Sequence, residues 1–314
     1  MMTTRSIPLS ALELSAAMRD ALPYDANRLD RVLRIDERYG LVEVQAATPW
    51  KTIAAALRPG DAHSAAAAMR MTLPTVGASL AHNAAGPDGR PAVTHVESIT
   101  LVTPGGELRR ASRTAHRDLF ALAAGGLDLF GALYSVTLSI GSLQRAVNES
   151  TAAEVIAAPE RAMPARALRL LLPPDKVDAF LLEARQRCAD WRLPLAGVKL
   201  RRTTEEQDSF LRWARRAYAA LTLHLAEPPV LGVAVRTMQL RHSLIDAAIA
   251  HGGSFPVSCT PEATRAQVEA CYPQLRAFLA EKRRVDPGER LTNAWYRHHR
   301  DLLTQKNCQV RFAA

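Results

Sequence analysis

Two stretches decide the fold of this chain: Glu97-Ser-Ile-Thr-Leu-Val-Thr-Pro-Gly-Gly-Glu-Leu108 and Gly125-Gly-Leu-Asp-Leu-Phe-Gly-Ala-Leu133. In the first, strand-forming residues run to Val102, and the turn Pro104-Gly-Gly106 reverses the chain, which predicts a β-hairpin. In the second, a glycine pair ends a short helix predicted for Asp118–Ala124, and a strand follows over Ala132–Ile140. Strands and helices are therefore mixed in this part of the chain.

The residues before this hairpin predict a second one. Val32–Asp36 and Leu41–Ala46 flank the turn Glu37-Arg-Tyr-Gly40. Val42 and Val44 alternate with polar neighbours, which is the period of a half-buried strand. Helical patterns flank the hairpin, over Ala11–Ala21 and Trp50–Leu57.

A run of small residues lies between the two hairpins: Leu73-Pro-Thr-Val-Gly-Ala-Ser-Leu-Ala-His-Asn-Ala-Ala-Gly86. It has few large apolar side chains, so we expect a loop rather than a core element. A loop of this kind lets backbone N–H groups approach a ligand closely. Residues 73–86 are therefore a candidate ligand-binding loop.

The second half of the chain has a different pattern. Residues from about 141 to 165 form a weakly patterned, alanine-rich connector, which we take as the domain boundary. Beyond it the order strand, helix, strand, strand, helix, strand predicts an α/β sandwich of ferredoxin-like kind. The predicted elements are Ala167–Leu172, Val177–Trp191, Leu195–Leu200, Ala219–Leu225, Leu231–His251 and Ser254–Val257. A final helical section, Pro261–Arg284, is expected to break at Pro273.

The composition indicates a soluble protein long enough for two domains. Of the 314 residues, 48% are hydrophobic and 23% charged, and 40 Lys and Arg against 31 Asp and Glu give a net charge of +9. The basic residues are scattered and have no stacking aromatic residues among them, so we expect no nucleic-acid partner. The sequence contains no run of about 18 apolar residues, so no membrane-spanning helix is predicted.

The cysteine pattern argues against a metal site. Cys188, Cys259, Cys271 and Cys308 are widely spaced, and no Cys-x-x-Cys pair is present. Neither a zinc site nor any other metal site is predicted from this spacing. Reduced thiols are the simplest interpretation, and we expect a cytoplasmic protein.

Taken in order, these stretches resemble the FAD-linked oxidases of the vanillyl-alcohol oxidase superfamily, whose flavin domain is of the PCMH type. Leu29–Trp50 resembles the family's strand-turn-strand-helix entry, and Pro74–Gly86 its second flavin-contacting loop. Residues 97–133 match most specifically, since family members have there a hairpin, a short helix and a glycine-rich turn against the flavin. Lys282–Pro287 and Trp295-Tyr296 resemble the closing segment.

The resemblance implies an α+β fold in which a two-lobed FAD-binding domain carries an α/β, ferredoxin-like substrate cap. Residues 1–145 would form the FAD-binding-type domain, 165–258 the cap, and 259–314 a segment that returns to the first domain. The ligands implied are a noncovalently bound FAD and a small-molecule substrate.

Carried onto this sequence, the resemblance implies two sets of cofactor-binding residues. One set would line the diphosphate and ring side of FAD: Pro74, Thr75, Val76, Gly77, Ala78, Ser79, His82, Asn83 and Gly86. The other would border the adenine or the flavin: Gly125, Gly126, Gly131 and Leu133. Small residues permit close contact with a cofactor, and exposed N–H groups bind anionic oxygens. Lys199 and His82 are the candidate catalytic residues, and the sequence does not choose between them.

The chain departs from the family pattern at several points. The helix over Ala11–Ala21 runs almost directly into residues 23–29, without the Gly-rich pyrophosphate loop that relatives have there. That loop supplies N–H donors and, in some relatives, the histidine that attaches FAD covalently. Ala78 replaces the second glycine of the second loop, and Ala85-Gly86 replaces its later His-Gly. Where relatives carry an aromatic and histidine-bearing strand, residues 254–260 have Phe255 as their single aromatic residue.

The sequence supports two functions. One is an FAD-dependent oxidoreductase acting on a small alcohol, sugar or related metabolite. The other is a degenerate, flavin-poor member, a pseudoenzyme that serves as a binding subunit or partner of a complete enzyme. A cofactor-free enzyme that reuses the cavity is a third reading, without a positive signal in the sequence. Fold alone does not choose among them.

Overall fold

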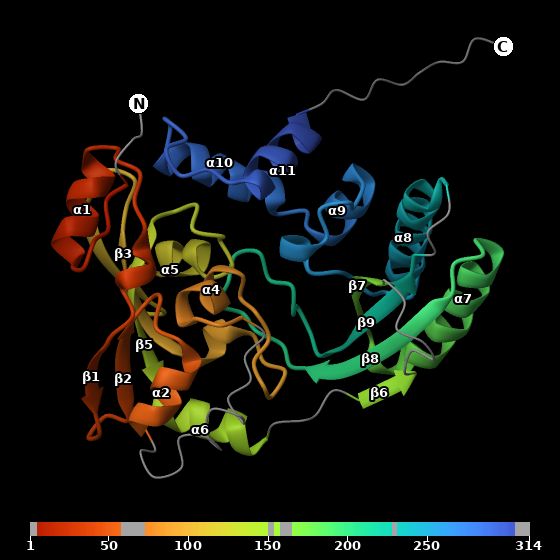
Figure 1. Cartoon of the computed structure of the whole chain (residues 1–314), viewed down its shortest axis with the longest axis horizontal. Helices are drawn as coiled ribbons and strands as arrows, with labels where there is room; N and C mark the ends of the chain where they lie inside the picture. Colours follow the sequence, from red (N-terminus) through yellow and green to blue (C-terminus); the bar gives the residue numbers. More distant parts are fainter. Residues whose placement is uncertain (1–4, 58–72, 150–153, 158–164, 228–230, 305–314) are drawn as a thin grey trace.

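The strands that the structure describes form two separate sheets (Figure 1). The computed structural model describes residues 5–57, 73–149, 154–157, 165–227 and 231–304. A five-stranded sheet has the order β1-β2-β5-β3-β4, and a four-stranded sheet, here called the cap sheet, has the order β6-β8-β9-β7. Together with the helices around them, they form an α+β fold, as predicted.

The five-stranded sheet is built from the two predicted hairpins, joined by one later strand. Its members are β1 (Val32–Asp36), β2 (Leu41–Gln45), β3 (Val96–Val102), β4 (Leu108–Ser112) and β5 (Ala132–Ser139). The central strand β5 pairs antiparallel with both β2 and β3, so that Val136 lies opposite Val44 on one side and Ile99 on the other. All three side chains are buried, and they form the middle of this core.

Five helices of the described chain accompany this sheet: α1 (Ala11–Arg19), α2 (Trp50–Leu57), α4 (Val76–Ala81), α5 (Arg117–Ala123) and α6 (Ile140–Asn148). Three of them match the predictions, whereas α4 and α6 do not. Residues 76–81 were expected in a loop, but the Thr75 side chain caps a short helix there. Residues 141–148 belong to the predicted connector and Ile140 to the predicted strand, yet Ser139 caps a helix there that buries Leu143 and Ala146.

The cap sheet consists of β6 (Glu154–Ala157), β7 (Ala165–Leu172), β8 (Leu195–Thr203) and β9 (Tyr218–Ala226). Helices α7 (Val177–Asp190) and α8 (Val233–Ala250) lie on its outer side, away from the five-stranded sheet (Figure 1). Leu168, Leu170 and Leu172 alternate along β7 into the core of this part of the molecule. The opposite face of the cap sheet looks toward the other half of the molecule.

The predicted strand Ser254–Val257 is wrong as a strand. Ser254 makes a single antiparallel bridge with Leu171 at the free edge of β7, and a 3-10 turn, Val257–Cys259, follows. Pro256 lacks an N–H group and cannot continue a ladder. The fourth strand of the sheet is instead β6, which comes from the connector and pairs with β8 at the other edge.

Three C-terminal helices pack against both halves (Figure 1): α9 (Arg265–Cys271), α10 (Leu275–Val285) and α11 (Ala294–Thr304). The predicted break at Pro273 is confirmed. The ring of Phe278 lies 5.0 Å from that of Phe130 and 5.9 Å from that of Phe210. Arg290 donates to Pro104 O at 2.7 Å, close to the hairpin turn. The division into residues 1–145, 165–258 and 259–314 stays a prediction.

Candidate functional site

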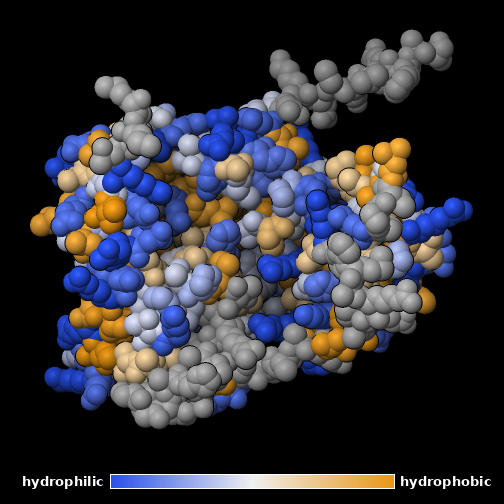
Figure 2. All heavy atoms as spheres, viewed as in Figure 1, coloured by the Kyte–Doolittle hydropathy of each residue, from blue (hydrophilic) through white to orange (hydrophobic). Residues whose placement is uncertain are grey.

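A cavity of about 440 Å³ lies between the two halves of the molecule. Residues 82–85, which follow α4, form one wall, and strands β7, β8 and β9 of the cap sheet form the other. Pro256, Ser258 and Cys259 line a third side. Figure 2 shows the surface hollowed between the two halves, with hydrophilic side chains at the margin of the hollow. The cavity thus joins the predicted ligand-binding loop to the predicted cap.

The loop wall, residues 73–86, uses its own N–H groups internally. Val76 N donates to Thr48 O at 3.1 Å, and Gly77 N donates to Ala46 O at 2.7 Å. Ala78 N donates to the Thr75 hydroxyl at 3.3 Å. These are the groups at a helix start that would otherwise be free to bind an anion. In this part of the described chain these N–H groups are bonded within the protein, and their contact with a diphosphate stays a prediction.

Asn83 fixes the end of the loop wall against the cap. Its backbone is left-handed, with φ of 44°, and its side chain is 1% exposed. The amide Nδ2 donates to Glu206 Oε1 and to Ser209 Oγ, both at 3.2 Å, while Oδ1 accepts from Val93 N at 3.0 Å. Trp213 Nε1 donates to Asn83 O at 2.7 Å. The amide Nδ2 and the backbone carbonyl of Asn83 therefore hold the two halves together, whereas Oδ1 is bonded within its own half.

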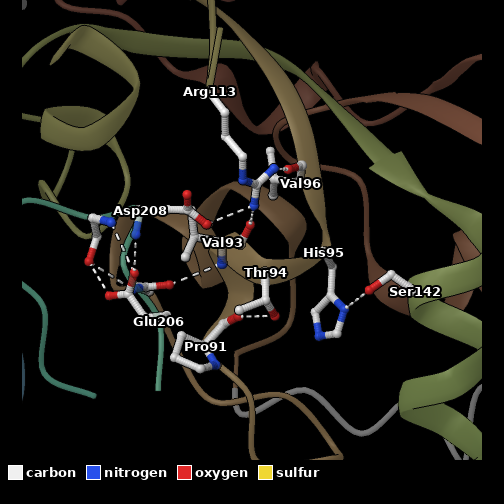
Figure 3. Close-up of polar contacts among 11 residues, drawn as sticks. Pro91, Val93, Thr94, His95, Val96, Arg113, Ser142, Glu206 and Asp208 are labelled. Carbon is white, nitrogen blue, oxygen red and sulfur yellow. Dashed lines mark hydrogen bonds and ion pairs between the residues drawn. The ribbon is translucent and has the colours of Figure 1, made fainter. Parts of the chain in front are cut away.

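Glu206 is the centre of this network (Figure 3). Its side chain is 3% exposed and accepts hydrogen bonds from Asp208 N at 2.8 Å and Ser209 N at 3.0 Å, in addition to those from the side chains of Asn83 and Ser209. Burial raises the pKa of Glu206, against the opposite effect of these hydrogen bonds. Beside it, Arg113 donates to Val93 O and to Asp208 Oδ2, both at 2.9 Å. The junction beside the cavity is therefore a closed polar network.

The sheet wall has a regular arrangement set by strand register. Thr222 on β9 is the register partner of both Arg169 on β7 and Lys199 on β8, so these three stand in one row across the sheet. The next row on the same face consists of Leu171, Ala220 and Arg201. Side chains two residues apart on a strand point to the same face. Three cations therefore line one face of the cavity.

Both candidate catalytic residues, His82 and Lys199, line this cavity from opposite walls. The His82 side chain is exposed at the cavity, and partial desolvation lowers its pKa. Neutral His82 is thus the dominant form at pH 7, which suits a proton acceptor. Cys259 also reaches the cavity, and burial raises the pKa of its thiol.

The structure divides the other predicted site residues between cavity and core. Asn83 lines the cavity, and Gly86 lies next to it with its carbonyl accepting from Arg201 Nη1 at 3.0 Å. Gly125 borders a smaller void beside His82 and Trp295. Gly131 packs on β3, where an added Cβ would lie 2.4 Å from Leu101 Cδ1.

The remaining members of the set lie where the chain packs on itself. An added Cβ at Gly126 would lie 1.9 Å from Leu122 O, and Leu133 is 7% exposed in the core. Pro74 O accepts from Trp50 N at 3.2 Å, and the Ser79 hydroxyl accepts from the Trp50 ring N–H at 3.0 Å. Their role in cofactor binding stays a prediction.

The sequence did not predict a buried polar cluster formed by Asp88, His95 and Ser142 near Gly86. His95 is 1% exposed, its Nδ1 lies 2.8 Å from Ser142 Oγ, and its Nε2 lies 3.8 Å from Asp88 Oδ1 (Figure 3 shows His95 and Ser142). Hydrogen bonding and the attraction of His95 hold the pKa of Asp88 low against its own burial. No spacing signal could identify the cluster, because its members come from three separate segments.

Comparisons with known proteins agree with this architecture. Residues 10–112 match the family described as FAD binding domain. A solved structure of xylooligosaccharide oxidase from Myceliophthora thermophila C1, in complex with xylobiose, is similar with a TM-score of 0.57 and 13% identity, covering 91% of this chain and 89% of that chain. Among curated proteins, none matches the sequence.

These findings confirm the resemblance and the fold predicted from the sequence, a PCMH-type FAD-binding domain with a cap. FAD is the cofactor that the match over residues 10–112 supports. In the described ranges, no group of three or more His, Cys, Asp or Glu residues could hold a metal ion. No helix among those described is long and apolar enough to cross a membrane.

Proposed function

We propose that this chain is an FAD-dependent oxidoreductase-like protein that takes the flavin ring and a small alcohol, sugar or related metabolite into the cavity between loop 82–85 and the cap sheet. The observation that supports this most is the position of the cavity, where the region matching an FAD binding domain meets the cap. A volume of about 440 Å³ falls within the range of ligand pockets, roughly 300–1,000 Å³.

The described residues suit the ring end of FAD better than its diphosphate. Ala84, Ala85 and Ala220 line the cavity, and their small side chains leave room for a planar ring. A bound flavin would supply a hydride acceptor. His82, which is neutral at pH 7, would accept the hydroxyl proton of the substrate. Lys199 is the alternative candidate on the other wall and would act as a hydrogen-bond donor.

The second candidate is a flavin-poor member that acts as a binding subunit or as the partner of a complete enzyme. It is favoured by one observation: the N–H groups at the start of α4 are already hydrogen-bonded within the protein. With the first pyrophosphate loop also missing from the sequence, a partner chain would have to supply the diphosphate donors. For its location we retain the cytoplasm, because Cys188, Cys259 and Cys271 are free thiols.

Comparing riboflavin with FAD tests the proposal. Because two or three charge-assisted hydrogen bonds to the diphosphate are missing, FAD binding should be weakened by about 3 kcal/mol, or roughly a hundredfold. We expect the protein to purify with little flavin, and calorimetric titration to give similar affinities for riboflavin and FAD. The FAD-loaded protein should then reduce a dye acceptor when supplied with sugars or polyols.

Each alternative result has a clear meaning. Stoichiometric yellow protein straight from cells, or FAD binding a hundredfold tighter than riboflavin, would show that a diphosphate cradle exists. Binding of neither flavin by the isolated chain would favour the second candidate, and FAD would then appear only in a complex with a partner chain. Flavin binding without dye reduction by any sugar or polyol would contradict the oxidoreductase activity itself.

A further inference from the structure

The cavity face of the cap sheet carries an excess of positive charge. Arg169, Lys199 and Arg201 all line the cavity, and they come from two strands on either side of β9. The titratable groups that share the cavity with them are His82 and Cys259, both uncharged near pH 7 because burial lowers the pKa of the first and raises that of the second. No carboxylate is among the described residues that line it.

Some arginine residues of the cap and its border are paired with acids. Arg241 forms an ion pair with Glu262, Arg187 with Glu183, and Arg113 with Asp208. By contrast, Arg201 donates to a neutral carbonyl, Gly86 O, and Arg169 Nη1 lies 3.8 Å from Cys259 Sγ. Within the ranges that the structure describes, none of the three cavity cations has a carboxylate within ion-pair distance. Arg169 and Lys199 are exposed and Arg201 is half-buried, so water screens their mutual repulsion, and an anion bound among them would reduce it further.

The register gives the position at which such an anion would sit. Thr222 lies directly between Arg169 and Lys199, with facing Cβ atoms about 5 Å away on each side. An oxygen anion above Thr222 is within reach of both long side chains and of the hydroxyl. Arg201, one row further along β8, extends the positive surface toward the loop wall.

We infer that the substrate of this cavity carries a carboxylate or phosphate group, held by Arg169 and Lys199 across Thr222, with Arg201 beside them. The inference rests on the proposed function in one respect, that the cavity is a substrate site. It narrows the substrate class from alcohols and sugars in general to acidic or phosphorylated sugars and polyols. Charge-assisted hydrogen bonds to two cations give such a substrate its advantage over a neutral sugar.

Calorimetry on the full chain without added flavin tests the inference independently of cofactor binding. Gluconate and glucose 6-phosphate should bind at least about tenfold more tightly than glucose, and this preference should shrink as salt is added. Lys199→Met and Arg169→Gln should each lower the affinity for gluconate and for glucose 6-phosphate by roughly fivefold or more, and leave the affinity for glucose unchanged. Arg185→Gln is the matched control, because Arg185 is exposed on α7, outside the cavity.

Three outcomes would overturn the inference. The first is equal affinity for glucose and the two anions, and the second is an unchanged anion affinity in both cavity variants with melting temperatures like the wild type. The third separates the two sources of phosphate. In this outcome inorganic pyrophosphate and FAD bind, and Lys199→Met weakens the binding of both, whereas gluconate and glucose 6-phosphate do not bind. The cations would then hold the cofactor and not the substrate. Failure of FAD to bind while gluconate binds would count against the proposed function alone.

Discussion

The loop wall of the cavity, residues 73–86, and its sheet wall, strands β7 to β9, differ in how their polar groups are paired. In the loop wall, backbone N–H groups and the Asn83 amide have partners at 2.7 to 3.3 Å within the protein. In the sheet wall, Arg169 and Lys199 point into the cavity without a carboxylate partner in the described chain. Fully paired buried groups fix a structure, whereas charges left without a partner are available to a ligand.

The loop wall has a packing role in addition to the cofactor contacts that the sequence predicts for it. A run of small residues around Gly77 predicts a surface for a cofactor, yet that glycine is needed for packing: an added Cβ would lie 2.7 Å from Ala46 O. In our proposal the cap sheet recognises the charge of the ligand, and Lys199 is the one residue of that sheet that the sequence suggests as a site residue.

The largest effect on the stability of the protein is expected for Gly77→Ala. The methyl group would press on the carbonyl of Ala46, which also accepts the hydrogen bond from Gly77 N, so that neither can move without loss. We expect the free energy of unfolding to fall by about 2–3 kcal/mol, as for other overpacked sites. Gly105→Ala is the control, since its nearest contact would be Thr103 Oγ1 at 3.9 Å. Urea denaturation measures both, and equal stability of the two variants would contradict the packing role.

A smaller loss is expected for Asn83→Ala, which opens the junction between the two walls. The substitution leaves Val93 N without its acceptor at 3.0 Å and removes one donor from Glu206. An unsatisfied buried group costs roughly 1–3 kcal/mol, so we expect about 2 kcal/mol of destabilisation. Asn148→Ala, at an exposed position in the last turn of α6, should change stability by less than about 0.5 kcal/mol. Comparable losses in both variants would count against the network.

The sequence was sufficient to predict the elements that are determined by residues close together in the chain. Both hairpins of the first sheet have turn residues between alternating strands, and the helix break at Pro273 follows from proline geometry. Helix α4 was missed because its stabilisation comes from Thr75 and from carbonyls of residues 46 and 48, not from its own apolar pattern. The same holds for β6, which is paired by a strand some forty residues later in the chain.

The charged face of the cavity could not be derived from spacing. Arg169, Lys199 and Thr222 are separated by more than twenty residues from one another, and sheet register alone brings them into one row. Each looks like an ordinary solvated strand residue in the sequence. The signal that could have helped is the alternation within β8, where Lys199 and Arg201 occupy the same face.

The smallest expected effect is on the rate at which the Cys259 thiol reacts. This residue lies next to Arg169 on the border of the two walls. Burial raises the pKa of its thiol, so less thiolate is present at pH 7 than in a free cysteine. Its reaction with disulfide reagents should therefore be slow, and should speed up about tenfold per pH unit below the pKa. Cys188 and Cys271 are buried and should not react in the folded protein.

A pair of reagents then reports the charge of the sheet wall. A dianionic aromatic disulfide should react with Cys259 several-fold faster than a neutral dipyridyl disulfide, after correction for their intrinsic reactivities, because Arg169 and Lys199 attract the anion. The thiolate fraction cancels in this ratio, which matters because Arg169 itself lowers the pKa of Cys259 against the effect of burial. Lys199→Met should bring the ratio toward one, Arg185→Gln should leave it unchanged, and Cys259→Ser gives the background from other thiols. A ratio near one in the unsubstituted protein would mean that the cations of the sheet wall do not act on ligands in the cavity.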